Sequence, residues 1–274
     1  MNFKAKVLVL GGTSESVQAA SLLAGSGARV ILSRATDLQQ EIPDLPGLGI
    51  ICGRLDQRGL KKVMADQNPS AVVDCTHPFA EKISENAWKV CTSLGVPFFV
   101  YDRPATQEAD CDLIRVRDHA RAAAEAFSFC RAVLLTIGTR NLPVYMQQAG
   151  QARARVCARL LPGPASLAKG VEAGLDPQDV IQARGPFTVQ ENMAHLRQTR
   201  VRCLVTKDSG RAGGVPEKLE AAGRLGVRVI MVNRPVRPGN NIFNNVHELV
   251  QDVLLKISSR TDLMQNKQEG KIYE

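Results

Sequence analysis

The sequence is poor in aromatic residues and has no long apolar run. Aromatic side chains make up 4% of the 274 residues, with one tryptophan and three tyrosines. With so few, and with no helix-turn-helix, RRM or zinc-finger pattern, a nucleic-acid partner is not expected, even at a net charge of +8. No apolar run approaches the roughly 20 residues that span a bilayer, and the first one ends at Gly11-Gly12, too early for a secretory signal. We expect a soluble, cytoplasmic protein with no membrane partner.

Metal-binding and disulfide patterns are absent as well. The seven cysteines form an odd set without any C-x-x-C pair. Several lie in apolar runs, which favours free thiols that pack as small apolar side chains. The four histidines are more than 40 residues apart and show no paired ligand spacing. We therefore expect no metal bound by the protein.

Three common enzyme motifs are also missing. The sequence has no G-x-x-x-x-G-K-[ST] and no G-x-S-x-G, which argues against P-loop ATPase and α/β-hydrolase chemistry. No tyrosine is followed four residues later by a lysine, so the residue pair of short-chain dehydrogenases is lacking.

What the sequence does contain is an ordinary globular composition, with 44% apolar and 23% charged residues, in a chain long enough for one or two domains. Short β-rich apolar runs alternate with helical patterns, which predicts βαβ units and parallel sheets buried on both faces. The predicted fold class is therefore α/β. Strands are expected at Lys6–Leu10, Arg29–Leu32, Gly49–Cys52, Ala71–Asp74 and Pro97–Tyr101, and then at Leu113–Val116, Ala132–Ile137, Arg155–Leu160, Asp179–Ala183, Cys203–Thr206 and Arg228–Val232.

An internal repeat indicates two similar halves. Residues 94–104 and 225–235 both begin with Leu-Gly-Val and end with Arg-Pro, and each follows a strand, a polar loop and a helix. We predict two Rossmann-like, doubly wound domains with a cleft between them. Residues 1–104 would form a dinucleotide-binding domain, residues 105–259 an Arg-rich substrate domain, and residues 260–274 a polar tail. Ligands in such sheets bind beyond the carboxyl ends of the strands.

The charge is concentrated in the second half. Residues 1–104 carry 11 basic and 10 acidic side chains, whereas residues 105–259 carry 21 and 14, with arginine as 17 of the 21. The planar guanidinium group suits carboxylates and phosphates. The second half therefore fits an anionic ligand, and a solvated basic surface is the alternative.

Two segments of the first half suit a dinucleotide. The strand before Gly11-Gly12-Thr13-Ser14 runs into a glycine turn and a helix, where backbone amides and the helix N-terminus attract phosphate. The full G-x-G-x-x-G fingerprint is absent, so a plain strand–helix turn is the alternative. The next strand ends at Ser33-Arg34, where NAD-specific folds carry an acidic residue. This pair suits the 2′-phosphate of NADPH, unless Arg34 is only a solvated loop residue.

Further loops with functional side chains follow other strands. The segment Thr76-His77-Pro78-Phe79-Ala80 stands after a buried strand, where Thr76 or His77 could instead cap the next helix. The segment 207–214, Lys-Asp-Ser-Gly-Arg-Ala-Gly-Gly, is typical of a loop that holds an anion. Gly53-Arg54 and the segment 184–187, Arg-Gly-Pro-Phe, have the same location after strand ends.

Taken together, these segments resemble the precorrin-6A reductase family of cobalamin biosynthesis, including its cobalt-precorrin-6A reductases. The similarity covers roughly residues 5–257, and T-H-P-F-A and T-K-D-S-G are its specific motifs. Other matching pieces are Gly11-Gly12-Thr13 with Glu15, Gly53-Arg54, Arg103-Pro104, Ile137-Gly138, Arg184-Gly185-Pro186-Phe187, Gly213-Gly214 with Lys218, and Arg234-Pro235. One departure is Ser16-Val17 after Glu15, where family members often have Ala-Arg.

The resemblance implies a reductase that uses NADPH or NADH to add hydride across one C=C bond of precorrin-6A, or of its cobalt form, giving precorrin-6B. Gly11, Gly12, Thr13, Ser14, Ser33, Arg34 and Thr76 would bind the cofactor. Arg54, Arg184, Lys207, Ser209, Gly213, Lys218 and Arg234 would bind the carboxylates of the tetrapyrrole. His77 or Asp208 would supply a proton, with water and the ring nitrogens of the substrate as alternatives. The small-molecule tetrapyrrole is then the main partner, and other corrin-pathway enzymes fit as further ones.

Two other functions remain open at this point. A nucleotide-sugar-binding transferase would share the two α/β halves and the glycine turn, although not the T-H-P-F-A loop. An NADPH-binding regulatory protein would share the cofactor site, but no appended effector or DNA-binding pattern accompanies it.

Overall fold

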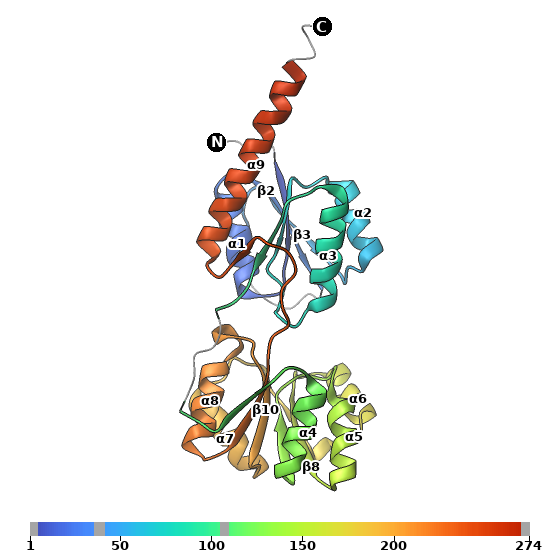
Figure 1. The fold of residues 1–274 in the computed structure, drawn as a ribbon, viewed down its shortest axis with the longest axis vertical. Coiled ribbons are helices and arrows are strands. Elements are labelled where there is room, and N and C mark those ends of the chain that lie inside the picture. Colours follow the sequence, from blue (N-terminus) through green and yellow to red (C-terminus); the bar gives the residue numbers. More distant parts are fainter. Residues whose placement is uncertain (1–4, 36–41, 105–109, 270–274) are drawn as a thin grey trace. The chain divides into compact units, whose positions relative to one another are not determined.

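A computed structural model describes residues 5–35, 42–104 and 110–269, with side chains as far as residue 259 at the C-terminal end. The chain forms two compact units (Figure 1). The first unit comprises residues 1–103 together with 235–274, and the second comprises residues 104–234. Each contains a six-stranded, all-parallel sheet, which confirms the predicted α/β fold with two Rossmann-like halves.

The sheet of the first unit has the strand order of a Rossmann fold. Its strands are β1 (Lys6–Leu10), β2 (Arg29–Arg34), β3 (Leu48–Cys52), β4 (Ala71–Asp74), β5 (Phe98–Tyr101) and β12 (Ile242–Phe243). They lie in the order β3-β2-β1-β4-β5-β12, so the direction of winding reverses between β1 and β4. In folds of this kind, ligands bind at that switch point, beyond the carboxyl ends of the two strands.

Helices cover both faces of the first sheet. They are α1 (Ser14–Gly25), α2 (Gln57–Gln67), α3 (Glu81–Leu94) and α9 (Val246–Glu269). Helices α1 and α9 pack on one face and α2 and α3 on the other (Figure 1). Because successive residues of a strand point to opposite faces, Val7 and Val9 join the core under α1 and α9, whereas Leu8 and Leu10 join the core under α2 and α3. This explains why the strand is a continuous apolar run.

The second unit repeats this arrangement. Its strands are β6 (Leu113–Val116), β7 (Ala132–Leu135), β8 (Arg155–Leu160), β9 (Val180–Gln182), β10 (Cys203–Lys207) and β11 (Arg228–Val232), in the order β9-β8-β7-β10-β11-β6. Its helices are α4 (His119–Phe129), α5 (Leu142–Ala152), α6 (Pro164–Glu172), α7 (Val189–Thr199) and α8 (Val215–Arg224). Helices α7 and α8 pack together, as do α4 and α5 (Figure 1). The switch point lies between β7 and β10.

The sequence repeat occupies equivalent places in the two sheets, since α3–β5 and α8–β11 place their strands beside β4 and β10. The strand at the outer edge, next to the repeated strand, differs in origin. In the first unit it is β12, which comes from the C-terminal part of the chain, and in the second unit it is β6, which opens the unit.

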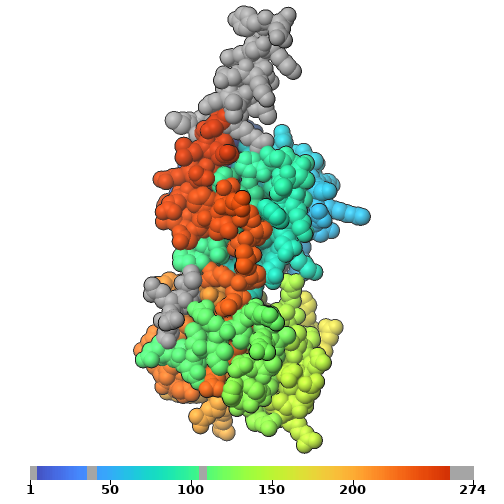
Figure 2. Space-filling model, viewed as in Figure 1, coloured from blue at the N-terminus to red at the C-terminus, as the bar shows by residue number. Residues whose placement is uncertain are grey.

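The expected domain division differs from the structure at its C-terminal end. Residues 235–259 were expected in the second domain, but β12 pairs with β5 and α9 packs on α1, which places them in the first unit. Figure 2 shows this returning segment, in orange and red, directly against the teal segment of the first unit. The reason is the apolar face of α9, whose buried residues are Val246, Leu249, Val250, Val253 and Ile257.

The predicted polar tail is helical for most of its length, because α9 continues to Glu269. Residues 270–274 lie outside the described part. Among the helices that the structure describes, none is both long enough and apolar enough to cross a membrane.

Candidate cofactor and substrate sites

The turn after β1 has the steric features of a ligand-binding glycine turn. A Cβ atom on Gly11 would lie 2.7 Å from Leu32 Cδ1 and 2.8 Å from Ser16 Oγ, so any larger residue there would have to displace these side chains. Gly12 has a φ of +110°, which favours glycine, and a Cβ atom on it would meet nothing within 4 Å. The space in front of the N-terminus of α1 is therefore open at Gly12.

Thr13 caps α1 and ties the glycine turn to the neighbouring strand. Its hydroxyl accepts from the Ser16 amide at 3.1 Å and donates to the carbonyl oxygen of Cys75 at 2.8 Å. Because a hydroxyl has one proton, the Thr13 side chain has none left for a phosphate. Ser14 is exposed, and its hydroxyl donates to Glu15 Oε2 at 2.9 Å.

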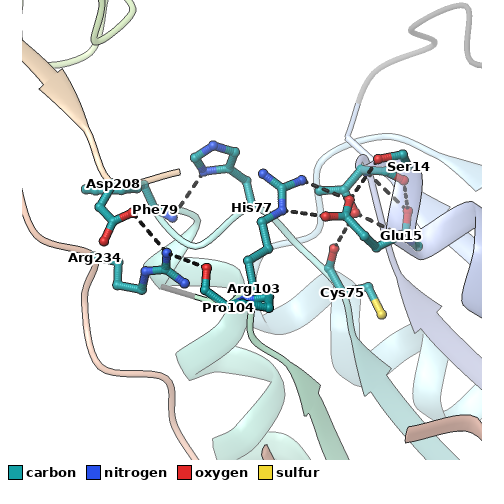
Figure 3. Close-up of polar contacts among 11 residues, drawn as sticks. Ser14, Glu15, Cys75, His77, Phe79, Arg103, Pro104, Asp208 and Arg234 are labelled. Carbon is teal, nitrogen blue, oxygen red and sulfur yellow. Dashed lines mark hydrogen bonds and ion pairs between the residues drawn. The ribbon is translucent and has the colours of Figure 1, made fainter. Parts of the chain in front are cut away.

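A paired arginine and glutamate lie beside this turn (Figure 3). Arg103, just after β5, donates to the two oxygens of Glu15 at 2.6 and 2.9 Å. The side chains are 9% and 12% exposed. Burial by itself would raise the pKa of Glu15, but the bonds and charge of Arg103 outweigh it and hold that pKa below its usual value. Arg103 thus neutralises the carboxylate of Glu15 in the first turn of α1. Without this pairing, the carboxylate would repel an anionic ligand at the N-terminus of the helix.

The second strand runs further than predicted, through Arg34. Ser33 is 5% exposed, and its carbonyl oxygen accepts from the Gly11 amide at 2.7 Å, so this residue shapes the turn. Arg34 is partly exposed at the end of β2, and Arg54 is exposed on the loop after the neighbouring β3. Arg54, predicted to bind the substrate, thus belongs to the same sheet edge as Arg34.

The loop after β4 is held by its own side chains. The amide and hydroxyl of Thr76 donate to Asp74 Oδ1 at 3.0 and 2.6 Å. His77 Nδ1 accepts from the Phe79 amide at 3.2 Å, which leaves the ring proton on Nε2 when the ring is neutral. Helix α3 begins after Ala80 without a side-chain cap. The alternative in which Thr76 or His77 caps this helix is therefore wrong.

In the second unit, Asp208 is a buried ion-pair partner. It follows β10, is 4% exposed, and lies 3.3 Å from Arg115 Nη1 and 3.0 Å from Arg234 Nη2. Arg234 also donates to the carbonyl oxygen of Pro104 at 3.3 Å (Figure 3). A carboxylate that accepts from two guanidinium groups is a poor proton donor. This geometry argues against the predicted catalytic role of Asp208. It also shows that Arg234 forms an ion pair with Asp208.

Behind the same loop lies a buried lysine. A Cβ atom on Gly213 would lie 1.9 Å from Ser209 Oγ, so glycine is required there. Lys218, in the first turns of α8, is 8% exposed and donates to the carbonyl oxygen of Gly213 at 2.7 Å. Burial, followed by the charges of Arg159 and Lys207, lowers the pKa of Lys218 to about 7. Burial also lowers the pKa of Lys207.

The sequence analysis missed Arg159. This residue of β8 is 8% exposed, and its guanidinium lies 4.0 Å from the centre of the Phe187 ring. It donates to Asn192 Oδ1 at 2.9 Å and lies 3.0 Å from His195 Nδ1. Burial lowers the pKa of Arg159 to about 10. The sequence feature that could have identified Arg159 is a charged residue within an otherwise apolar stretch of a predicted strand.

The second unit therefore gathers positive charge at its strand ends. Within the described residues, neither Arg159 nor Lys218 forms an ion pair with a carboxylate. Lys207 is close enough to affect the pKa of Lys218. By contrast, Arg184 is exposed on the loop after β9. The nearby charges of Glu191 and Glu217 act on Arg159 and Lys218, but burial outweighs them and lowers both pKa values. Buried cations are costly unless an anion compensates them, so this cluster suits an anionic ligand.

The strand order and the glycine turn place the protein in the Rossmann-like class of α/β proteins. Comparison with known families is more specific, because a family model described as precorrin-6x reductase CbiJ/CobK matches residues 6–254. The chain belongs to this family.

Relatives with curated names agree with the family. The chain is 32% identical to a cobalt-precorrin-6A reductase of Methanothermobacter thermautotrophicus, covering 92% of this chain and 84% of the relative. It is 33% identical to a precorrin-6A reductase of Rhodobacter capsulatus, covering 86% and 91%. Among solved structures, a CobK precorrin-6A reductase matches with a TM-score of 0.74 and 31% identity, over 92% of this chain and 97% of that one.

Proposed function

We propose that this protein reduces one C=C bond of precorrin-6A, or of its cobalt form, to give precorrin-6B in cobalamin biosynthesis, with NADPH as the hydride donor. The membership of the chain in the precorrin-6x reductase family supports the reaction. The observation that carries the proposal is the pair of buried cations in the second unit, Arg159 and Lys218, each 8% exposed. The family assignment favours this function over a nucleotide-sugar transferase or a regulatory protein.

The second unit would bind the substrate. A ring-contracted tetrapyrrole has acetate and propionate groups around its rim, and carboxylates form strong charge-assisted bonds with lysine and arginine. We assign Lys207, Lys218 and Arg159 to these carboxylates. Ser209 and Gly213 shape the loop between them, and Arg184 adds positive charge at the exposed edge. Arg234 would act chiefly by holding Asp208.

The first unit would bind the cofactor, and its residues fit a dinucleotide. The open space at Gly12 and the N-terminus of α1 suit a pyrophosphate. Gly11 allows the close packing of the turn, Thr13 fixes it, and Ser14 is exposed at its entrance. Arg34 and Arg54, at neighbouring strand ends, suit the 2′-phosphate of NADPH. When bound, the nicotinamide supplies the hydride, and the protein supplies orientation and charge.

Reduction of the C=C bond also needs a proton. Asp208 is committed to Arg115 and Arg234. His77 Nδ1 accepts from the Phe79 amide, so the neutral ring carries its proton on Nε2; to donate that proton, the ring would take up a second one at Nδ1, which breaks the bond to Phe79. We therefore assign proton donation to His77, with Thr76 holding the loop beside the nicotinamide. The Thr76 hydroxyl itself donates to Asp74.

The test is a titration of the purified protein with NADPH and with precorrin-6A or cobalt-precorrin-6A, followed by absorbance. We expect loss of NADPH to match the loss of macrocycle conjugation one to one. Binding of NADPH without turnover of either macrocycle would favour the regulatory function. No response to NADPH or macrocycle would favour the nucleotide-sugar enzyme. Comparing the two macrocycles side by side identifies which form is the substrate.

A further inference from the structure

Four buried side chains of the first unit form a closed ring of polar contacts next to the Thr76–His77 loop. The amide and hydroxyl of Thr76 donate to Asp74 Oδ1 at 3.0 and 2.6 Å. Arg237 Nη2 lies 3.1 Å from Asp74 Oδ2, and Arg237 Nη1 donates to Ser84 Oγ at 3.0 Å. Ser84 Oγ lies 3.3 Å from Thr76 Oγ1 and completes the ring. The four residues are at most 8% exposed.

Arg237 is the member of this ring that comes from a distant part of the sequence. Asp74, Thr76 and Ser84 belong to β4, the loop after it and α3, whereas Arg237 lies in the segment that returns from the second unit to β12. The side chain of Asp74 is 0% exposed. Burying a carboxylate without an opposite charge beside it is costly, and Arg237 provides that charge.

Asp74 is the acceptor that holds the loop. Both bonds from Thr76 end on its Oδ1, and pairing with a guanidinium fixes the orientation of such a carboxylate. No side chain caps the helix that follows at Ala80. On its other side, the loop is tied to the glycine turn by the bond from Thr13 to Cys75.

We propose that Arg237 is a positioning residue for the Thr76–His77 loop. By pairing with Asp74, it orients Thr76 and thereby the imidazole of His77. The returning segment thus supports the reactive loop of the first unit as well as adding an edge strand. The link to catalysis rests on the function proposed above, whereas the link to the orientation of His77 does not.

The test compares Arg237→Met with a variant that destabilises the same unit elsewhere. Val253→Ala is the matched control, because Val253 is 0% exposed on α9 and its methyl groups lie in the apolar core, outside the polar ring. Ser84→Ala removes the second anchor of Arg237 without removing a charge, and Arg237→Lys keeps the charge. These two variants cover the case in which Arg237→Met does not fold.

The readouts are the ring ¹⁵N signals of His77, assigned with His77→Asn, together with kcat and the KM for NADPH. In Arg237→Met we expect the His77 signals to show loss of the single Nε2–H tautomer and kcat to fall about 10- to 100-fold. Arg237→Lys should recover part of both, and Ser84→Ala should show a smaller change of the same kind. Val253→Ala should lower the melting temperature but keep the His77 signals and kcat.

Two results would overturn the proposal. The first is an Arg237→Met protein (or, if it does not fold, an Arg237→Lys and a Ser84→Ala protein) with unchanged His77 signals and kcat. The second is a Val253→Ala protein that shows the same changes as Arg237→Met. If the unmodified protein reduces neither macrocycle, the proposed function fails, and the His77 signals alone still decide the role of Arg237.

Discussion

Lys218 provides a direct test of the charge cluster in the second unit. Its pKa is lowered from the usual 10.5 to about 7, first by burial and then by Arg159 and Lys207. The unfolded chain therefore binds more protons at this site than the folded protein between these pH values, so stability should rise with pH over that interval. The free-energy cost of burying the charged Lys218 amine is fully present below pH 7. One such group contributes up to about 1.4 kcal/mol per pH unit, and at most about 5 kcal/mol in total.

The perturbation is Lys218→Met, which keeps the side-chain volume and removes the titrating amine. The variant loses the bond to Gly213, at a cost of about 1–3 kcal/mol, but it also loses the larger charge penalty. We expect it to be more stable than the unmodified protein at pH 6.5 by about 2–4 kcal/mol. This advantage should shrink with increasing pH and reverse between about pH 8 and pH 10.

The assay is urea unfolding followed by circular dichroism from pH 6.5 to 9.5. Lys169→Met serves as the control, because Lys169 is an exposed lysine of the same unit. If the free energies of unfolding of Lys218→Met and of the unmodified protein run parallel across this range, the pKa of Lys218 is not lowered by folding. A second consequence concerns the substrate: the KM for the polyacidic macrocycle should rise above pH 7, and Lys218→Arg should remove this dependence.

Three other perturbations address the remaining assignments. Arg34→Glu should raise the KM for NADPH at least about tenfold more than the KM for NADH. The control is Arg29→Glu, at the opposite end of the same strand, which should affect both KM values equally. If Arg34→Glu also raises both KM values equally, Arg34 does not bind the 2′-phosphate. Lys207→Ala should raise the KM for the macrocycle about tenfold or more and leave the KM for NADPH unchanged. The opposite pattern would mean that the second unit binds NADPH and the first unit binds the macrocycle. Arg103→Met leaves Glu15 without its partner and should lower the free energy of unfolding at pH 7 by about 2–4 kcal/mol. Because the folded state lowers the pKa of Glu15, this loss of stability should shrink as the pH falls below about 4.5. Urea unfolding at pH 7 and pH 4 measures the change. A loss of stability that is independent of pH would contradict the ion pair between Arg103 and Glu15.

The fold class and the ends of its strands follow from local patterns in the sequence. Continuous apolar runs such as Val7–Leu10 can be buried on both faces only in a parallel sheet covered by helices. Ligand sites follow strand ends in such sheets, so the loops at Gly11, Thr76 and Lys207 were identifiable without coordinates. The repeat that ends in Arg-Pro likewise indicated two similar units, because local patterns of this kind require no knowledge of distant contacts.

Which segments and charges meet follows from the three-dimensional packing of the chain. Strand β12 has only two residues, which is too short for a recognisable sequence pattern. The position of α9 depends on which uncovered sheet face its apolar side can pack against. The sequence could not show that Asp208 is paired with Arg115 and Arg234, nor that Arg159 is buried against Phe187 and Asn192. Such pairings join residues far apart in the chain, and their protonation depends on burial, which no local sequence pattern encodes.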